Sequence, residues 1–286
     1  MVTPIVIDEA AVPAARTRRH NRFTDYAGVT AGIAPIVLLL LASLILPLPY
    51  SPTQPDPAAV TLPPGPQHWF GTDGSGFDVL SRTIASAKID LPVAFGGALL
   101  SLVIGVPLGL LASSDRWFAH LIMRATDVLQ SLPLLIVTVA VVSLAGNSIG
   151  NVIFGIVLVG APGFIRLVRS AALVVRSSRY VDAAIAMGCS PLRVLRVHVF
   201  PNVFSIALVQ FTLATSTAII VIAGLNFLGI GTAAPTPSWG VMIRSGADVI
   251  GQGYWWVATF PSLAVVLVVV SLNFVSRSLD DLVAGR

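Results

Sequence analysis

Five long runs of residues without Lys, Arg, Asp or Glu limit the fold more than any other feature of the chain. They cover residues 26–55, 91–114, 128–165, 197–243 and 249–276. A helix needs about 20 apolar residues to cross the hydrocarbon core of a bilayer, where no water satisfies exposed backbone groups. Each run is long enough for at least one crossing. The sequence therefore predicts an all-α integral membrane protein.

The number of crossings follows from the lengths of these runs. Residues 128–165 are too many for one span, and the small and polar stretch 145–151 divides them into two helices. The first crossing is expected at residues 27–48 and the fifth at about residues 200–225, which makes six transmembrane helices in total. Only 10% of the 286 residues are charged, against about 25% in soluble domains, so most of the surface must face lipid.

The positions of the basic residues predict the orientation. If both termini lie in the cytoplasm, 14 of the 17 Lys and Arg residues fall on the cytoplasmic side, and only Arg82, Lys88 and Arg244 fall outside. We therefore expect a multi-pass protein of the cytoplasmic membrane. Its expected organisation is a cytoplasmic tail 1–26, a first span 27–48, an extracytoplasmic segment 49–88, a five-helix core 89–277 with an inside loop 166–201, and a cytoplasmic tail 278–286.

The scarcity of certain residues excludes several enzyme classes. Glu9 is the single glutamate and Lys88 the single lysine, and Lys88 lacks the neighbouring glycine and hydroxyl residue of a phosphate-binding P-loop. Cys189 is the only cysteine, so neither an internal disulfide nor a multi-cysteine metal site can form. The arginines lie in short loops between apolar runs, which indicates topology and not nucleic-acid binding. We expect no catalytic residue, cofactor or metal in this chain.

The inside loop predicts two short helices separated by a sharp break. Gly188 suits the position after the end of a helix, and Ser190 suits an N-cap. Pro191 suits the first helical position, because its missing N–H needs no partner there. Arg193 and Arg196 alternate with apolar residues in the second helix. Two interpretations follow: a rigid lever that docks on a soluble partner, or an amphipathic helix on the membrane surface.

The same loop resembles the EAA loop of binding-protein-dependent ABC transporter permeases. Asp182-Ala183-Ala184, Gly188, His198 and Pro201 match the family pattern in order and spacing, with Asp182 in place of the usual glutamate. In that family the loop enters a groove on the ATPase subunit. The resemblance implies the type I importer permease fold, also called MetI-like. It also implies a coupling role for Tyr180, Asp182, Ala183, Ala184, Gly188, Ser190, Pro191, His198 and Pro201.

Two outer segments narrow the resemblance to the C-type dipeptide, oligopeptide and nickel permeases. One is Gly71-Thr72-Asp73 followed by residues 76–82, in which Phe77 replaces the usual arginine; the other is residues 226–240. The resemblance implies a permease subunit of an ATP-driven importer of di- and oligopeptides in a bacterial membrane. Implied partners are a homologous B-type permease, two ATPase subunits that bind ATP and Mg²⁺, an extracytoplasmic binding protein, the peptide and membrane lipid. A nickel-chelate or other small-solute importer, and a secondary transporter, are the alternatives.

The fifth span carries the most hydroxyl groups of any span. A peptide path needs hydrogen-bonding groups without a deep binding site, so these side chains are candidates to line it. The alternative is that the hydroxyls bond to carbonyls of their own helix. The candidates are Thr212, Thr215, Ser216, Thr217 and Asn226.

Two other patterns concern helix packing. Small residues recur every four positions in the second span, which predicts close packing of this helix within the subunit. They are Gly97, Ser101, Gly105 and Gly109. Arg124 and Asp127 are spaced to form a pair on one helix face near the cytoplasmic end of the third span.

Overall fold

The computed structural model describes residues 22–232 and 235–284, so most of the predicted tail 1–26 lies outside the described residues. Within this part of the chain the protein is helical, with one isolated β-bridge between Thr72 and Asp78 and no strand. The elements in order are α1 (Arg22–Ile45), α2 (Val79–Ala112), α3 (Trp117–Gln130), α4 (Leu134–Ala145), α5 (Ile149–Arg176), α6 (Arg179–Ala186), α7 (Pro191–Val194), the π-turn η2 (Leu195–Val199), α8 (Phe200–Phe227), α9 (Trp239–Val249), the 3₁₀ turn η3 (Ile250–Gln252) and α10 (Trp256–Ala284).

Five helices of the described chain are long and apolar enough to cross a membrane, and the number is six if one bent pair of helices counts as a single span. The pair is α3 and α4, whose axes differ by 92° across a short break. The third span was expected to be one helix beginning near residue 128, and this expectation was wrong. Pro133 explains the break, because a residue before proline is disfavoured in the α region and the proline ring cannot continue the preceding helix.

The second helix starts earlier than the charge-free run predicts. It begins at Val79 instead of about residue 91, because the side chain of Asp78 caps it by accepting a hydrogen bond from the Ser81 N–H. Its 34 residues give a length of about 51 Å at 1.5 Å per residue, well beyond the roughly 30 Å of a bilayer core. The last part of the predicted extracytoplasmic segment 49–88 is therefore the first three turns of α2.

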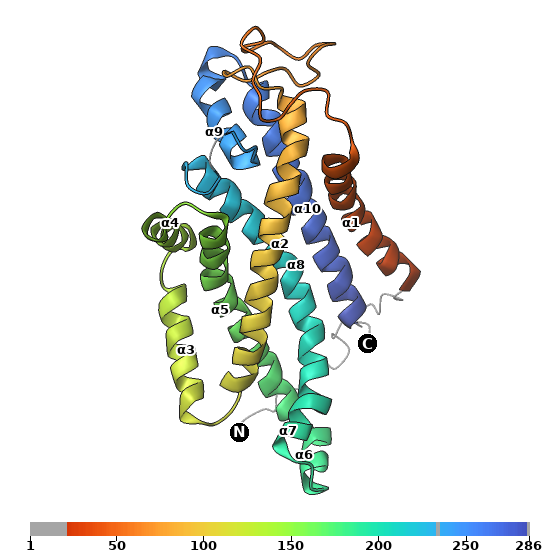
Figure 1. The fold of residues 1–286 in the computed structure, drawn as a ribbon. Coiled ribbons are helices and arrows are strands. Elements are labelled where there is room, and N and C mark those ends of the chain that lie inside the picture. Colours follow the sequence, from red (N-terminus) through yellow and green to blue (C-terminus); the bar gives the residue numbers. More distant parts are fainter. Residues whose placement is uncertain (1–21, 233–234, 285–286) are drawn as a thin grey trace, which may run out of the picture.

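Figure 1 shows α2 running through the centre of the molecule, with α5 and α8 beside it and α1 next to α10. The folded segment 46–78 and α9 lie at one end of the bundle, which we call the α9 end. The helices α6 and α7 extend beyond the bundle at the opposite end, which we call the hairpin end. Helix α1 begins, and helix α10 ends, on the side of the bundle that faces the hairpin end.

Close packing of α2 on α5 confirms the role of the small residues in the second span. A Cβ atom at Gly105 would overlap the side chain of Phe164, and one at Gly109 would lie 2.7 Å from the Cβ of Val168. Both partners belong to α5 of the same chain and are fully buried. The glycines thus allow the two helix backbones to approach closely within the subunit.

The segment before α2 folds around buried polar contacts. His68 lies 2.9 Å from the carboxylate of Asp78, measured from Nδ1 to Oδ1, and both side chains are buried. Asp78 therefore holds both the start of α2 and the preceding loop. Phe77, where the resemblance expects arginine, lies under the guanidinium of Arg82 at 4.0 Å from its ring centre. The substitution leaves a stacking partner for this buried cation.

Candidate functional site

The predicted break between the two short helices is confirmed by the backbone geometry. Gly188 has φ of +86°, a conformation that glycine adopts without the cost of a Cβ atom. Its N–H donates to the carbonyl of Ile185 at 2.9 Å, and the Cys189 N–H donates to the carbonyl of Ala184 at 3.1 Å. These two bonds form a Schellman motif, which satisfies the last carbonyls of α6 and reverses the chain.

The second short helix begins as predicted, but it is not separate from the fifth span. The hydroxyl oxygen of Ser190 accepts a hydrogen bond from the Arg193 N–H, and Pro191 occupies the first turn. The helix then continues through η2 directly into α8. In η2 the Phe200 N–H donates to the carbonyl of Leu195, five residues back. Pro201 explains this π-turn, because it has no N–H to continue the α-helical pattern. The loop is therefore joined to the fifth span without a break.

One face of the α6–α7 hairpin, residues 179–194, is fixed to the bundle. Val181 and Val194 are buried in an apolar cluster that also contains Leu110 of α2 and Val168 of α5, and Ala184 is buried as well. Burial of side chains of this size contributes about 1–3 kcal/mol each. Together with the capped helix ends, this packing makes the hairpin a rigid extension of α2, α5 and α8.

The opposite face of the hairpin exposes apolar side chains at its tip. Met187 is 79% exposed, and Ile185 and Leu192 are each 56% exposed. The charged side chains of Asp182 and Arg193 are exposed beside them. A cluster of large apolar side chains with charged neighbours is the usual composition of a protein-binding surface.

The remaining residues of the predicted coupling set lie around this tip. The ring of Tyr180 lies 5.9 Å from the ring of His198, which connects the start of α6 to η2. Ala183 and Pro201 are exposed, and the side chain of His198 is half-buried. The structure thus brings the set together in one region.

Arginines at the hairpin end of α5 cap the end of α2. Arg169 donates from Nε to the carbonyl of Ala112 at 3.0 Å, and Arg176 donates to the carbonyl of Ser113 at 3.1 Å. These carbonyls have no partner within their own helix, and a cationic donor at a helix C-terminus is favourable. The sequence identified these arginines only as a topology signal.

The expected pair of Arg124 with Asp127 is replaced by a longer-range contact. Asp127 accepts a hydrogen bond from Arg166 of α5 at 2.7 Å. Arg124 makes no ion pair with any residue in the described part of the chain. Arg166 reaches the carboxylate because α3 packs on α5, a relationship that spacing along one helix cannot reveal.

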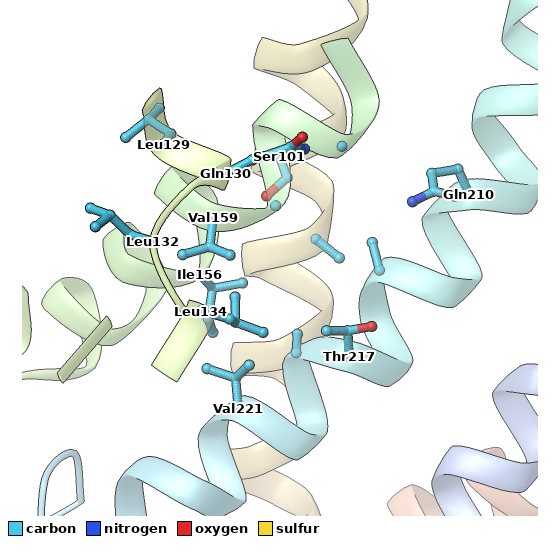
Figure 2. A pocket seen from close by; sticks show the side chains of 15 residues that line it. Ser101, Leu129, Gln130, Leu132, Leu134, Ile156, Val159, Gln210, Thr217 and Val221 are labelled. Atoms are coloured by element: carbon cyan, nitrogen blue, oxygen red, sulfur yellow. The ribbon is translucent and has the colours of Figure 1, made fainter. Parts of the chain in front are cut away.

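A cavity of about 470 Å³ lies between α2, α5, α8 and the bent pair α3–α4, and we call it the central pocket. Figure 2 shows Gln210 and Thr217 on α8, on the other side of the pocket from Ser101 and the break after Gln130. The lining contains no charged side chain. The amides of Gln130 and Gln210 make no hydrogen bond to a described residue, so both can bind a solute.

The sequence analysis did not identify Ser101, Gln130 and Gln210 as lining residues. Gln130 and Gln210 could have been found as glutamines within the charge-free runs 128–165 and 197–243. Their convergence depends on the bend at Pro133, which brings the end of α3 to the lining of the same cavity as α8. Residue patterns within a single span carry no such information.

The five candidate path residues of the fifth span differ in what their side chains contact. Thr212 and Thr215 donate to the carbonyls of Val209 and Phe211 in the same helix, each at 2.8 Å. Their hydroxyls therefore take the alternative role of bonding to their own helix. Of the five candidates, Thr217 alone lines the central pocket, and its contact with solute stays a prediction.

Ser216 and Asn226 are also buried and have partners inside the subunit. The hydroxyl of Ser216 accepts a hydrogen bond from Asn273 of α10 at 3.1 Å. Asn226 donates to the hydroxyl of Ser238 at 2.7 Å and lies near the α9 end. These two side chains hold α8 to its neighbours and do not line the central pocket.

A buried carboxylate at the α9 end escaped the sequence analysis. Asp90 precedes the second charge-free run by one residue, yet it lies inside α2 and is 2% exposed. Its Oδ2 accepts hydrogen bonds from the Ser238 hydroxyl at 3.1 Å and from the Trp239 N–H at 2.9 Å. The indole N–H of Trp239 donates to the carbonyl of Thr83. Asp90 thereby holds the first turn of α9 against α2.

The described residues contain no group of three or more His, Cys, Asp or Glu side chains that could hold a metal ion. A bundle of membrane-crossing helices, an uncharged cavity among them and a rigid hairpin beyond them define the membrane-spanning component of a transporter.

Comparison with known proteins identifies the kind of transporter. Residues 102–286 match the family described as the binding-protein-dependent transport system inner membrane component. The chain belongs to this family. It is therefore a multi-pass inner membrane component of an ABC importer, and it works with a binding protein and ATPase subunits instead of catalysing ATP hydrolysis itself.

Relatives cover nearly the whole chain. The di/tripeptide transport system permease protein DppC of Pseudomonas aeruginosa is 36% identical over 91% of this chain and 88% of its own length. The dipeptide transport system permease protein DppC of Alkalihalophilus pseudofirmus is 35% identical over 86% of this chain and 80% of its own length. A putative peptide transport system permease protein of Brucella abortus is 32% identical over 96% of this chain and 90% of its own length.

A solved structure shares the fold. The MetNI methionine ABC transporter in an inward facing conformation aligns with 72% of this chain and 95% of its own chain, with a TM-score of 0.55 and 22% sequence identity. The predicted type I permease architecture is thus confirmed.

Proposed function

We propose that this chain is the permease subunit that carries di- and oligopeptides across the bacterial cytoplasmic membrane. The peptide assignment is supported by the names of the relatives, which are peptide permeases over nearly the full length of this chain. Its partners in this proposal are a homologous B-type permease, two ATPase subunits that bind ATP and Mg²⁺, and an extracytoplasmic binding protein.

The central pocket suits a peptide backbone. Amide side chains donate to and accept from peptide groups, and Gln130 and Gln210 offer both kinds of group with no internal partner. Without a charged side chain, the pocket has no preference for the charge of a peptide side chain. Selection of particular peptides then belongs to the binding protein.

The proposal that the hairpin couples to an ATPase subunit rests on its exposed tip. A helix that lies on the membrane surface keeps its apolar side chains in the lipid and its charged side chains in water. Here the inward apolar face is already buried against α2, α5 and α8, while Ile185, Met187 and Leu192 are exposed at a tip that extends beyond the bundle (Figure 1). A groove on an ATPase subunit covers such a tip. The hairpin end, the N-terminus and the C-terminus are accordingly cytoplasmic.

Rigid connections then carry movement from the ATPase to the pocket. The hairpin is continuous with α8, which holds Gln210 and Thr217, and Arg169 and Arg176 join α5 to the end of α2. Closure of the ATPase dimer on ATP displaces the hairpin, and these helices turn the central pocket outward. Hydrolysis returns the pocket to the inward-facing state.

The test is transport by the complete complex in proteoliposomes with its binding protein and ATP. We expect uptake of labelled dialanine and stimulation of ATP hydrolysis by dialanine. Gln130→Ala and Gln210→Ala should each reduce uptake severalfold, while Gln252→Ala, an exposed glutamine outside the central pocket, should not. Stimulation by a nickel chelate and not by peptides would contradict the substrate assignment.

A further inference from the structure

A second polar cavity lies between the central pocket and the hairpin end. Its volume is about 350 Å³, within the range of small-molecule sites, and we call it the inner pocket. It is formed by the first half of α8, the second half of α10 and one residue of α5. Gln210 lines both this cavity and the central pocket. The two cavities therefore adjoin at one side chain on α8.

The inner pocket differs from the central pocket in its charge. Arg277 and Asp280 line it, together with the polar side chains of Asn273 and Ser276. Both charged side chains are exposed, and neither makes an ion pair with another residue in the described part of the chain. One cation and one anion are thus available to a solute on the same helix face.

The spacing of the two charges favours a short zwitterion. Side chains three residues apart on a helix have Cβ atoms about 5–6 Å apart. A dipeptide in an extended conformation spans about 7 Å from its ammonium to its carboxylate, and each further residue adds about 3.5 Å. A dipeptide can therefore reach both charges when the two side chains lie side by side, whereas an extended tetrapeptide, about 14 Å long, reaches both only when they splay apart.

We propose that the inner pocket is a binding site for the charged termini of a dipeptide, with Asp280 contacting the ammonium and Arg277 the carboxylate. On the peptide transport proposed above, on which this site rests, the peptide passes Gln210 from the neutral central pocket into the inner pocket before release. Apolar side chains of α5 and α8, such as Leu167 and Leu213, accommodate the peptide side chains.

The experiment measures binding of labelled dialanine to the complete complex in phosphatidylcholine nanodiscs, without ATP or binding protein. We expect Arg277→Gln and Asp280→Asn each to weaken binding roughly tenfold, the effect of losing one contact to a charged group. N-acetyl-dialanine amide should not compete, and tetra-alanine should compete at least tenfold less well than dialanine. Arg124→Gln, an exposed arginine that lines neither cavity, serves as the matched control and should bind normally.

Two further sets of measurements control for misfolding of the variants and for binding of a lipid headgroup. Basal ATP hydrolysis is measured for every variant, and the double variant Arg277→Asp with Asp280→Arg should recover binding if the complex folds and the charges act on the peptide. A phosphatidylethanolamine headgroup is also a zwitterion, so the assay is repeated in nanodiscs that contain this lipid. Normal binding by both single variants, or retention of the lipid in place of dialanine, would overturn the site.

The site and the proposed function fail in different ways. Uptake of dialanine by wild-type proteoliposomes is measured in parallel. If the wild type takes up dialanine and both variants bind it normally, the inner site is refuted and the peptide transport proposal is retained. Absence of dialanine uptake in the wild type, with uptake of another solute, removes the transport proposal itself.

Discussion

Arg176 of α5 donates a hydrogen bond from its guanidinium to the carbonyl of Ser113, just beyond the last turn of α2, over 3.1 Å. Arg169, two turns earlier on α5, does the same for Ala112. The α6–α7 hairpin begins three residues after Arg176. These two side chains therefore fasten the end of α2 to the part of α5 that leads into the hairpin.

Replacement of Arg176 by glutamine should weaken this connection. The Ser113 carbonyl loses a charged donor, and an unsatisfied acceptor of this kind costs about 1–3 kcal/mol where water does not replace it. We expect a lower Tm of the complex and at least a severalfold loss of ATP-driven uptake. Arg116→Gln, an exposed arginine in the loop after α2, should change neither quantity. Equal Tm and uptake for both variants would show that the cap does not transmit movement.

Gly188 provides a test of the hairpin turn that separates backbone strain from side-chain size. No atom lies within 4 Å of a Cβ built at Gly188, so a side chain has room, but its φ of +86° disfavours any residue with a Cβ. Gly188→Val should strain the turn by about 1–2 kcal/mol and reduce coupled transport strongly. Gly188→Asn should retain most activity, because asparagine tolerates this conformation better. Binding-protein capture should be normal in both, and full transport by the valine variant would argue against the coupling role.

The exposed tip can be tested at Met187 alone. Met187→Glu places a charge in the surface proposed to enter the ATPase groove, and desolvation of that charge should weaken assembly at least tenfold. Met187→Leu retains an apolar side chain of similar volume and should assemble normally. Co-purification of the ATPase subunits with the permease gives the readout. Equal assembly of the two variants would place the docking surface elsewhere.

The features predicted correctly from the sequence are local ones. The Gly188 turn and the Ser190 cap depend on residues within one or two turns of each other, so the residue types alone specify them. The apolar runs located the crossings for the same reason. The contacts that the sequence did not reveal join distant segments: Asp127 to Arg166, and Asp90 to Trp239.

The fifth span shows why composition alone does not identify a path. In an apolar environment, a threonine hydroxyl bonds to a carbonyl one turn back in its own helix, as those of Thr212, Thr215 and Thr217 do. A high hydroxyl content therefore does not distinguish a pathway from a packed helix. The central pocket is instead marked by Gln130 and Gln210, whose amides have no internal partner.

Asp90 should hold the first turn of α9 in place. Asp90→Asn keeps an oxygen acceptor for the Trp239 N–H, whereas Asp90→Leu leaves that buried donor without a partner, at a cost of about 1–3 kcal/mol. We expect the leucine variant to expose the α9 segment to proteolysis in sealed cells and to lower the Tm of the complex. The asparagine variant should resemble the wild type. Identical proteolysis of all three proteins would show that Asp90 does not secure α9.

Cys189 reports the orientation of the chain. It is the single cysteine and is half-buried at the hairpin turn, so a membrane-impermeant maleimide should label it slowly in inside-out vesicles and not in intact cells. A matched reporter for the other side is Trp69→Cys in a Cys189→Ser background, because Trp69 is 70% exposed in the segment before α2. That reporter should show the reverse pattern. If Cys189 is labelled in intact cells and Trp69→Cys only in inside-out vesicles, the chain has the opposite orientation. The hairpin could then not meet a cytoplasmic ATPase.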